Sequence, residues 1–212
     1  MKLFKNIKKW LENQEHLFYL FLLILIVPNI ILCFTEPMPV VAKVCNVLLP
    51  FAFYYLLMTL SRNCGKMFWI LFLFIFFGAF QIVLLYLFGQ SIIAVDMFLN
   101  LVTTNSSEAM ELLDNLVPAL VSVIILYIPA LILAVISIIK KRKLSPEFIR
   151  RERKKAWIAL FIGFISLGAA YGLDKRYELK SDLYPANVCY NVALAFQRNA
   201  QTRTYHRTSE NF

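Results

Sequence analysis

Five long apolar runs dominate this chain of 212 residues and restrict it to a helical, membrane-embedded fold. Each run approaches the ~20 residues that a helix needs to cross a hydrocarbon core of roughly 30 Å. A lipid-exposed span must satisfy its own backbone hydrogen bonds, so each run is expected to be helical. Hydrophobic residues make up 60% of the chain, which exceeds the share in a soluble domain. The expected spans are residues 17–34, 40–60, 67–88, 116–139 and 156–173.

The distribution of basic residues predicts how these spans are oriented. Fifteen of the 22 Lys and Arg residues fall in the N-terminal segment and in loops 61–66 and 140–155, whereas the alternate loops have none. Positive charge stays on the cytoplasmic side of a membrane. We therefore expect these three segments to be cytoplasmic, and segment 89–115 and residues 174–212 to lie outside. The net charge of +9 then reflects topology and attraction to anionic lipid rather than a nucleic-acid site.

The predicted fold class is an all-α membrane protein with the N-terminus inside and the C-terminus outside. Its membrane domain occupies residues 1–173, with five transmembrane helices and an external juxtamembrane amphipathic helix over residues 91–115. Residues 174–212 are polar and are expected to be an external linker. Within that linker, Tyr184-Pro185 predicts an extended break, after which residues 186–199 can form an amphipathic helix.

A polar stripe in segment 91–115 is the main candidate site. Asp96, Asn100, Thr104 and Glu108 recur every four residues and so share one face of a helix. Lys, Arg and His are absent from residues 67–139, so this acidic face can receive a cationic head group. The alternative is the solvated face of an interfacial helix. Asn105 and Glu108 also fit a capping box, which would break the helix near Thr104.

Several polar residues inside the spans have two possible roles. Asn46 and Gln81 are site candidates by position, but a hydrogen bond between helices is the simpler interpretation. Lys43 is expected to extend toward the outer interface. Pro28, Pro50 and Pro129 are expected to kink their helices, with neighbouring groups satisfying the freed carbonyls.

The rest of the sequence contains few candidate metal-binding or catalytic residues. The four cysteines and two histidines show no metal-ligand spacing, so no metal site is expected in this chain. Cys33 and Cys45 flank the same outer loop and can approach each other, although packed free thiols are the favoured interpretation. Ser145-Pro146-Glu147 is typical of a helix start, which predicts a cytoplasmic helix that continues into the fifth span.

The stripe also carries a family resemblance. The pattern D-M-x-x-N-x-x-x-T-x-x-x-E, formed by Asp96, Met97, Asn100, Thr104 and Glu108, resembles the lipid A phosphoethanolamine transferases, the group that includes the colistin-resistance enzymes. The segment YPANVCYN, residues 184–191, is similar to the stretch that joins their fifth span to the catalytic domain. The resemblance covers essentially the whole chain.

This resemblance implies a cellular location and a function for the protein. It implies a multi-pass protein of the bacterial inner membrane, with a periplasmic C-terminal tail. Asn100, Thr104 and Glu108 would bind the donor, phosphatidylethanolamine, and the acceptor would be lipid A. The nucleophilic Thr and the zinc ligands of the family belong to a later periplasmic domain of the same polypeptide, so this chain alone is expected to be inactive and to hold no cofactor.

Two other classes remain open from the sequence. One is a sister transferase of the same superfamily that modifies another envelope glycan or lipid. The other is a non-enzymatic membrane scaffold or transport component. Membrane lipids are the expected partners in every case, and nucleic acid in none.

Overall fold

The computed structural model describes residues 2–88 and 106–209, and every regular element in these ranges is a helix. Side chains between residues 106 and 116 lie outside this description. The all-α class expected from the sequence is confirmed for these ranges. The helices are α1 (Lys2–Glu12), α2 (Gln14–Thr35), α3 (Val40–Met58), α4 (Cys64–Ile70), α5 (Phe72–Phe88), α7 (Ser106–Ile139), α8 (Pro146–Leu173), α9 (Leu179–Asp182) and α10 (Ala186–Ser209).

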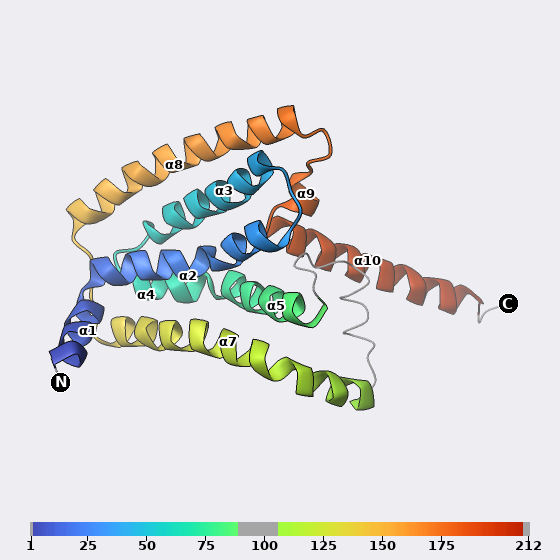
Figure 1. Cartoon of the computed structure of the whole chain (residues 1–212), viewed down its shortest axis with the longest axis horizontal. Helices are drawn as coiled ribbons and strands as arrows, with labels where there is room; N and C mark the ends of the chain where they lie inside the picture. The colour runs from blue at the N-terminus through green and yellow to red at the C-terminus, as the bar shows by residue number, and fades with distance from the viewer. Residues whose placement is uncertain (1, 89–105, 210–212) are drawn as a thin grey trace.

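Within residues 2–88 and 106–209, four stretches of helix are long and apolar enough to cross a membrane, namely α2, α3, α8 and residues 117–139 of α7. The region expected as the third span is divided at Leu71 into α4 and the 17-residue α5. Helices α2, α3, α4–α5, α7 and α8 pack into one bundle and alternate in direction (Figure 1). Helix α8 packs on α3, α3 packs on α2, and α4–α5 pack on α2 and α7.

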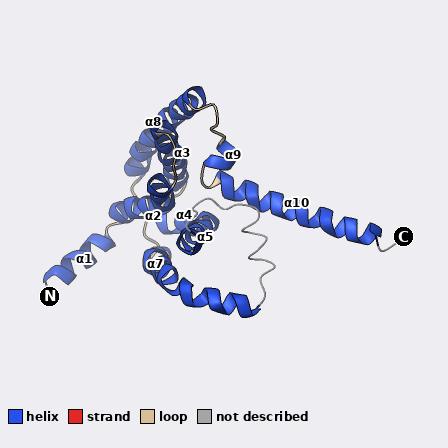
Figure 2. Ribbon diagram, turned by 45° about the vertical axis from the view of Figure 1, so that its right-hand side comes forward, coloured by secondary structure: helices blue, strands red, loops and turns tan. Residues whose placement is uncertain are grey.

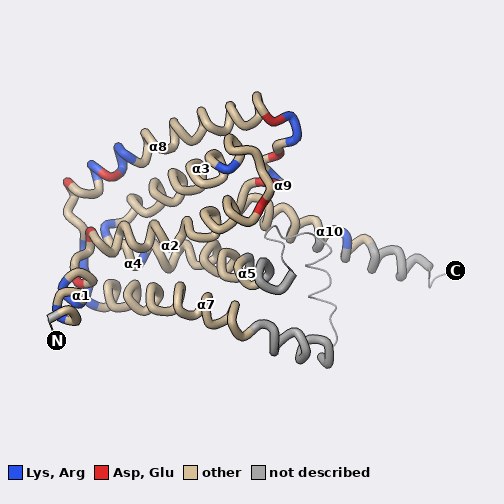
Figure 3. The backbone as a smooth tube through the Cα atoms, in the orientation of Figure 1, with Lys and Arg blue, Asp and Glu red and all other residues tan. Residues whose placement is uncertain are grey.

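The two ends of the bundle differ in charge. We call the end that carries α1, loop 59–63 and loop 140–145 the basic end, and the end that carries loop 36–39 and α9 the far end. Figure 3 shows most of the described Lys and Arg residues gathered around the basic end. Helix α10 leaves from the far end and extends away from the bundle (Figure 2).

Helix α7 differs from its expected form. The sequence indicated one helix over residues 91–115 and a separate span from residue 116. In the structure a single helix runs from Ser106 to Ile139, with Pro118 and Pro129 inside it. Residues 106–115 are therefore the first turns of the same helix, whereas residues 91–105 lie outside the described ranges.

Close backbone contact holds the bundle together at two glycines. A Cβ at Gly65 of α4 would lie 2.4 Å from the carbonyl oxygen of Ala134 in α7, which is far inside van der Waals distance. Gly163 of α8 faces Leu49 of α3 at 3.2 Å in the same way. Gly65 thus lets α4 approach α7 more closely than a side chain would permit, whereas at Gly163 a side chain would require a small shift of Leu49.

Side-chain caps define the helix ends at the basic end. Asn63 accepts the N–H of Lys66 at the start of α4 and donates to the carbonyls of Ser137 in α7 and of Arg142 in the loop that follows α7. Ser145 accepts the N–H of Phe148, and Pro146 is the first residue of α8. The helix start predicted at Ser145 is thereby confirmed, as is its continuation into residues 156–173.

Candidate functional site at the far end of the bundle

The residues predicted to bind the donor are only partly placed. Asn100 and Thr104 lie outside the described residues, as does Asn105, so the predicted stripe and capping box stay predictions. Glu108 belongs to the first turn of α7, but its side chain is not described. The described chain resumes at Ser106, after α5 has ended at Phe88.

A buried hydrogen-bond cluster lies at the far end of the bundle, centred on Asn46 of α3. The Oδ1 of Asn46 accepts the Tyr177 hydroxyl at 2.9 Å, and its Nδ2 donates to the carbonyl of Asp182 at 2.8 Å. Burial raises the pKa of the Tyr177 phenol well above its ordinary value, so this hydroxyl remains a donor. Asn46 thus binds the chain that follows α8, which confirms a hydrogen-bonding role. The side chain of Gln81 is not described.

Asn29 of α2 completes the cluster through two backbone carbonyls. Its Nδ2 donates to the carbonyl of Asn46 and to that of Tyr184, both at 2.9 Å. Pro50 has no N–H, so the Asn46 carbonyl four residues earlier lacks its partner within the helix. Asn29 supplies the missing donor, as the sequence predicted in general terms for the proline-freed carbonyls. We call Asn29, Asn46, Tyr177, Asp182 and Tyr184 the far-end clamp.

Tyr184 packs deeply against the bundle. Its hydroxyl donates to the carbonyl of Phe74 in α5 at 3.2 Å, and its ring packs with Leu32 and Val188. Burial raises the pKa of this phenol well above its usual value, so it too stays neutral. The Tyr184-Pro185 peptide bond is cis, and α10 begins at Ala186. The predicted break and helix start are confirmed, and the helix continues beyond the expected residue 199.

Gly78 of α5 provides the room for this packing. A Cβ at Gly78 would lie 2.9 Å from Pro28 Cγ, 2.9 Å from the Tyr127 hydroxyl and 3.1 Å from the Tyr184 hydroxyl. Helices α2, α5 and α7 therefore meet the linker segment at one point. The far-end clamp and Gly78 together fix where the chain leaves the bundle.

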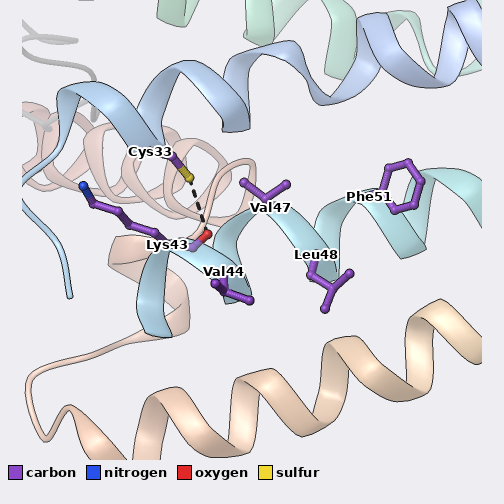
Figure 4. A pocket seen from close by; sticks show the side chains of 6 residues that line it. All are labelled: Cys33, Lys43, Val44, Val47, Leu48 and Phe51. Atoms are coloured by element: carbon purple, nitrogen blue, oxygen red, sulfur yellow. Dashed lines mark hydrogen bonds between the residues drawn. The ribbon is translucent and has the colours of Figure 1, made fainter. Parts of the chain in front are cut away.

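An apolar groove runs between α2 and α3 near the same end (Figure 4). It has a volume of about 390 Å³. Lys43 stands at one end of the groove and Phe51 at the other, with Val44, Val47 and Leu48 between them (Figure 4). The thiol of Cys33 donates to the Lys43 carbonyl at 3.4 Å. The apolar lining suits a lipid acyl chain, and the Lys43 side chain points away from the other lining residues at the end of the groove (Figure 4).

Two of the cysteines, Cys45 and Cys64, are buried, whereas Cys33 is half-buried and Cys189 is exposed. All four are free thiols. Cys33 faces the groove, whereas Cys45 lies 3.6 Å from the Tyr177 hydroxyl, so the two have different neighbours. Within residues 2–88 and 106–209 no three metal-ligating side chains come together.

Sequence reasoning missed most of the far-end clamp. Asn29, Tyr177, Asp182 and Tyr184 are far apart in the chain, and no local pattern joins them. One signal was present, because Asn46 stands four residues before Pro50 and must leave its carbonyl free for another donor. At the basic end the sequence also gave no role to Glu152, whose fully buried carboxylate accepts from Tyr55, Arg151 and Lys155.

Comparisons with known proteins identify no relative. The chain matches no family model, no curated protein and no solved structure.

Proposed function

We propose that this chain is the membrane domain of a phosphoethanolamine transferase of the bacterial inner membrane, which moves phosphoethanolamine from phosphatidylethanolamine to lipid A. One observation carries the proposal, namely the spacing of Asn100, Thr104 and Glu108 within a stretch that has no cationic side chain. The role of the domain is to anchor the enzyme and to bind the donor lipid.

The chemistry of the donor fits these three side chains. Phosphatidylethanolamine presents an ammonium group and a phosphodiester at the membrane surface. The Glu108 carboxylate would pair with the ammonium, and Asn100 and Thr104 would hydrogen-bond the rest of the head group. A charge-assisted bond of this kind contributes ~1.5–3 kcal/mol. Because residues 67–139 contain no Lys, Arg or His, no side chain of this stretch competes for Glu108.

The arrangement of the helices supports the proposed topology. With α4 and α5 together as a fifth span, the basic end is cytoplasmic and the far end periplasmic. The segment 89–105 connects α5 to α7 and would then be periplasmic. The far-end clamp would start α10 on the same side, toward the catalytic domain that the resemblance places after the membrane domain. The groove beside Lys43 would hold an acyl chain of a lipid substrate.

Transfer itself would depend on that catalytic domain. Phosphoryl transfer needs an activated nucleophile and, in this family, zinc to stabilise the developing charge. The membrane domain would present the head group, and the catalytic Thr would attack its phosphorus. Because the membrane domain would bind the donor and the catalytic domain would carry out the transfer, donor binding is the property that can be measured on this chain.

Native mass spectrometry of the purified chain, titrated with phosphatidylethanolamine and phosphatidylcholine, tests donor binding. We expect phosphatidylethanolamine to be retained preferentially, because the quaternary amine of choline cannot donate a hydrogen bond to Glu108. Glu108→Ala should weaken this retention by about tenfold to hundredfold, from ~1.5–3 kcal/mol at ~1.4 kcal/mol per decade. Glu108→Gln should recover part of it, since the amide keeps the shape and loses the charge.

Glu111→Ala and Asp114→Ala are the matched controls, because both remove a carboxylate near Glu108 but outside the family pattern. Equal, small losses at all three positions would show a merely solvated acidic face. The absence of any head-group preference would favour a scaffold or transport component instead. If the donor preference holds but lipid A gains no mass in cells that make the complete enzyme, a sister transferase with another acceptor is indicated.

A further inference from the structure

Helix α1 is a basic amphipathic helix that lies at the basic end of the bundle (Figures 1 and 3). Leu3, Phe4, Ile7 and Trp10 are 75%, 77%, 49% and 45% exposed along one face. Lys5, Lys8 and Lys9 occupy the other faces. A helix with this pattern lies in the plane of a membrane surface, with its apolar side in the lipid.

A cavity separates α1 from the last two turns of α7. Its volume is about 400 Å³, which is in the range of pockets that hold small ligands. Phe4, Ile7 and Leu11 form the α1 wall, and Leu133 and Ile136 form the α7 wall. From Leu133 to Lys140 the cavity follows about 10 Å of helix, at ~1.5 Å per residue.

Three cationic residues line this cavity. Lys8, Lys140 and Arg142 line it together with one carboxylate, Glu12. Arg142 is held in place by a hydrogen bond of 3.1 Å from its Nη1 to the Glu12 carbonyl, which uses one of the five guanidinium N–H donors. Within the described residues, none of the three cations forms a salt bridge. Three cations against one carboxylate leave the lining of the cavity with an excess of positive charge.

We propose that this cavity, between α1 and the end of α7, binds an anionic phospholipid. The phosphodiester would lie among Lys8, Lys140 and Arg142, and an acyl chain would lie against Leu133 and Ile136. A cavity lined by both apolar side chains and cations matches the two parts of such a lipid, and basic pockets between membrane helices on the cytoplasmic side take anionic head groups. The site is separate from the proposed donor site and does not depend on the proposed transferase function.

Native mass spectrometry of the full chain, titrated with phosphatidylglycerol, cardiolipin and phosphatidylcholine, tests the proposal. We expect phosphatidylglycerol or cardiolipin to be retained at least about tenfold better than phosphatidylcholine. Comparison of phosphatidylglycerol with cardiolipin shows which anionic head group the cavity binds better. The double variant Lys8→Gln, Lys140→Gln should lose about tenfold or more of this retention, at ~1 kcal/mol for each Lys near an anionic surface.

Two further variants separate a built site from general charge attraction. The double variant Arg150→Gln, Lys154→Gln removes the same charge from exposed positions of α8 that do not line the cavity, and it should keep the retention. Ile136→Trp fills the cavity without changing the charge, and it should lose the retention. Equal losses in the two charge variants, or full retention in Ile136→Trp, would overturn the proposal. Thermal unfolding of each variant without added lipid checks that the fold is intact.

Discussion

At the scale of single residues, the far-end clamp uses a backbone carbonyl that is left free within one helix to form a hydrogen bond between two helices. Pro50 deprives the Asn46 carbonyl of its helical partner, and Asn29 of the neighbouring helix donates to it at 2.9 Å. The same Asn29 amide holds the Tyr184 carbonyl. Two asparagines that look like isolated polar residues in apolar runs therefore connect α2, α3 and the chain after α8.

Tyr177→Phe should destabilise the protein by about 1–2 kcal/mol, because it removes the hydroxyl that Asn46 accepts and leaves a buried amide oxygen without a donor. Tyr190→Phe is the matched control, since Tyr190 lies on the exposed side of α10, and it should change little. Thermal unfolding in detergent measures both. Equal stability of the two variants would mean that the Tyr177 hydrogen bond contributes nothing net.

Glu152 provides a second test at this scale. Its carboxylate is fully buried, and Arg151 and Lys155 lie 2.9 Å and 3.1 Å from it. Glu152→Ala should cost ~1–3 kcal/mol of stability, because Tyr55 and the two cations lose their acceptor. Glu147→Ala, on the exposed first turn of the same helix, should cost less. A loss at Glu147 as large as that at Glu152 would contradict a structural role for the buried carboxylate.

At the scale of helices, glycines decide how closely the elements approach. Gly78 lies where α2, α5, α7 and Tyr184 meet, and Gly65 lies where α4 touches α7. Neither contact tolerates a larger residue without movement of backbone or ring atoms. By contrast, Gly168 of α8 has no neighbour within 4 Å, so its lack of a side chain has no packing role in the described structure.

Gly78→Ala should destabilise the protein by roughly 1–3 kcal/mol, since its Cβ would overlap Pro28 and two tyrosine hydroxyls. Gly168→Ala should be neutral or stabilising, because alanine restricts the unfolded chain at a position with open space. The pair can be compared by thermal unfolding, and proteolysis of the purified protein would report loosening of α10. A neutral Gly78→Ala would show that the far end repacks freely.

At the scale of the whole molecule, the orientation in the membrane is the property on which the proposed function depends. Reporter fusions that become active only outside the cytoplasm should be active at Ala200 and silent at Leu144. The physical reason is the charge of the basic end, where residues 140–155 alone carry nine Lys or Arg residues. The reverse pattern would place segment 89–105 in the cytoplasm, on the opposite side of the membrane from the proposed periplasmic donor site.

The sequence by itself determined the helical class, four of the five spans that it predicted, and the ends of several helices. Hydrophobic length and local capping decide these features, as the start of α8 at Ser145-Pro146 and of α10 after Pro185 show. The sequence also indicated the third apolar region, although not its division at Leu71. Local chemistry suffices where the interaction lies within a few residues.

Only the tertiary structure decided which polar groups work together. The clamp joins Asn29 to Tyr184, 155 positions later, and Asn46 to Tyr177, 131 positions later. No periodicity encodes such pairs, because each residue finds its partner only after the helices have packed. The same holds for Glu152 and for the cavity beneath α1, whose walls come from opposite parts of the chain. Within one helix the sequence specifies the geometry, whereas between helices the fit of side chains, glycines and freed carbonyls does so.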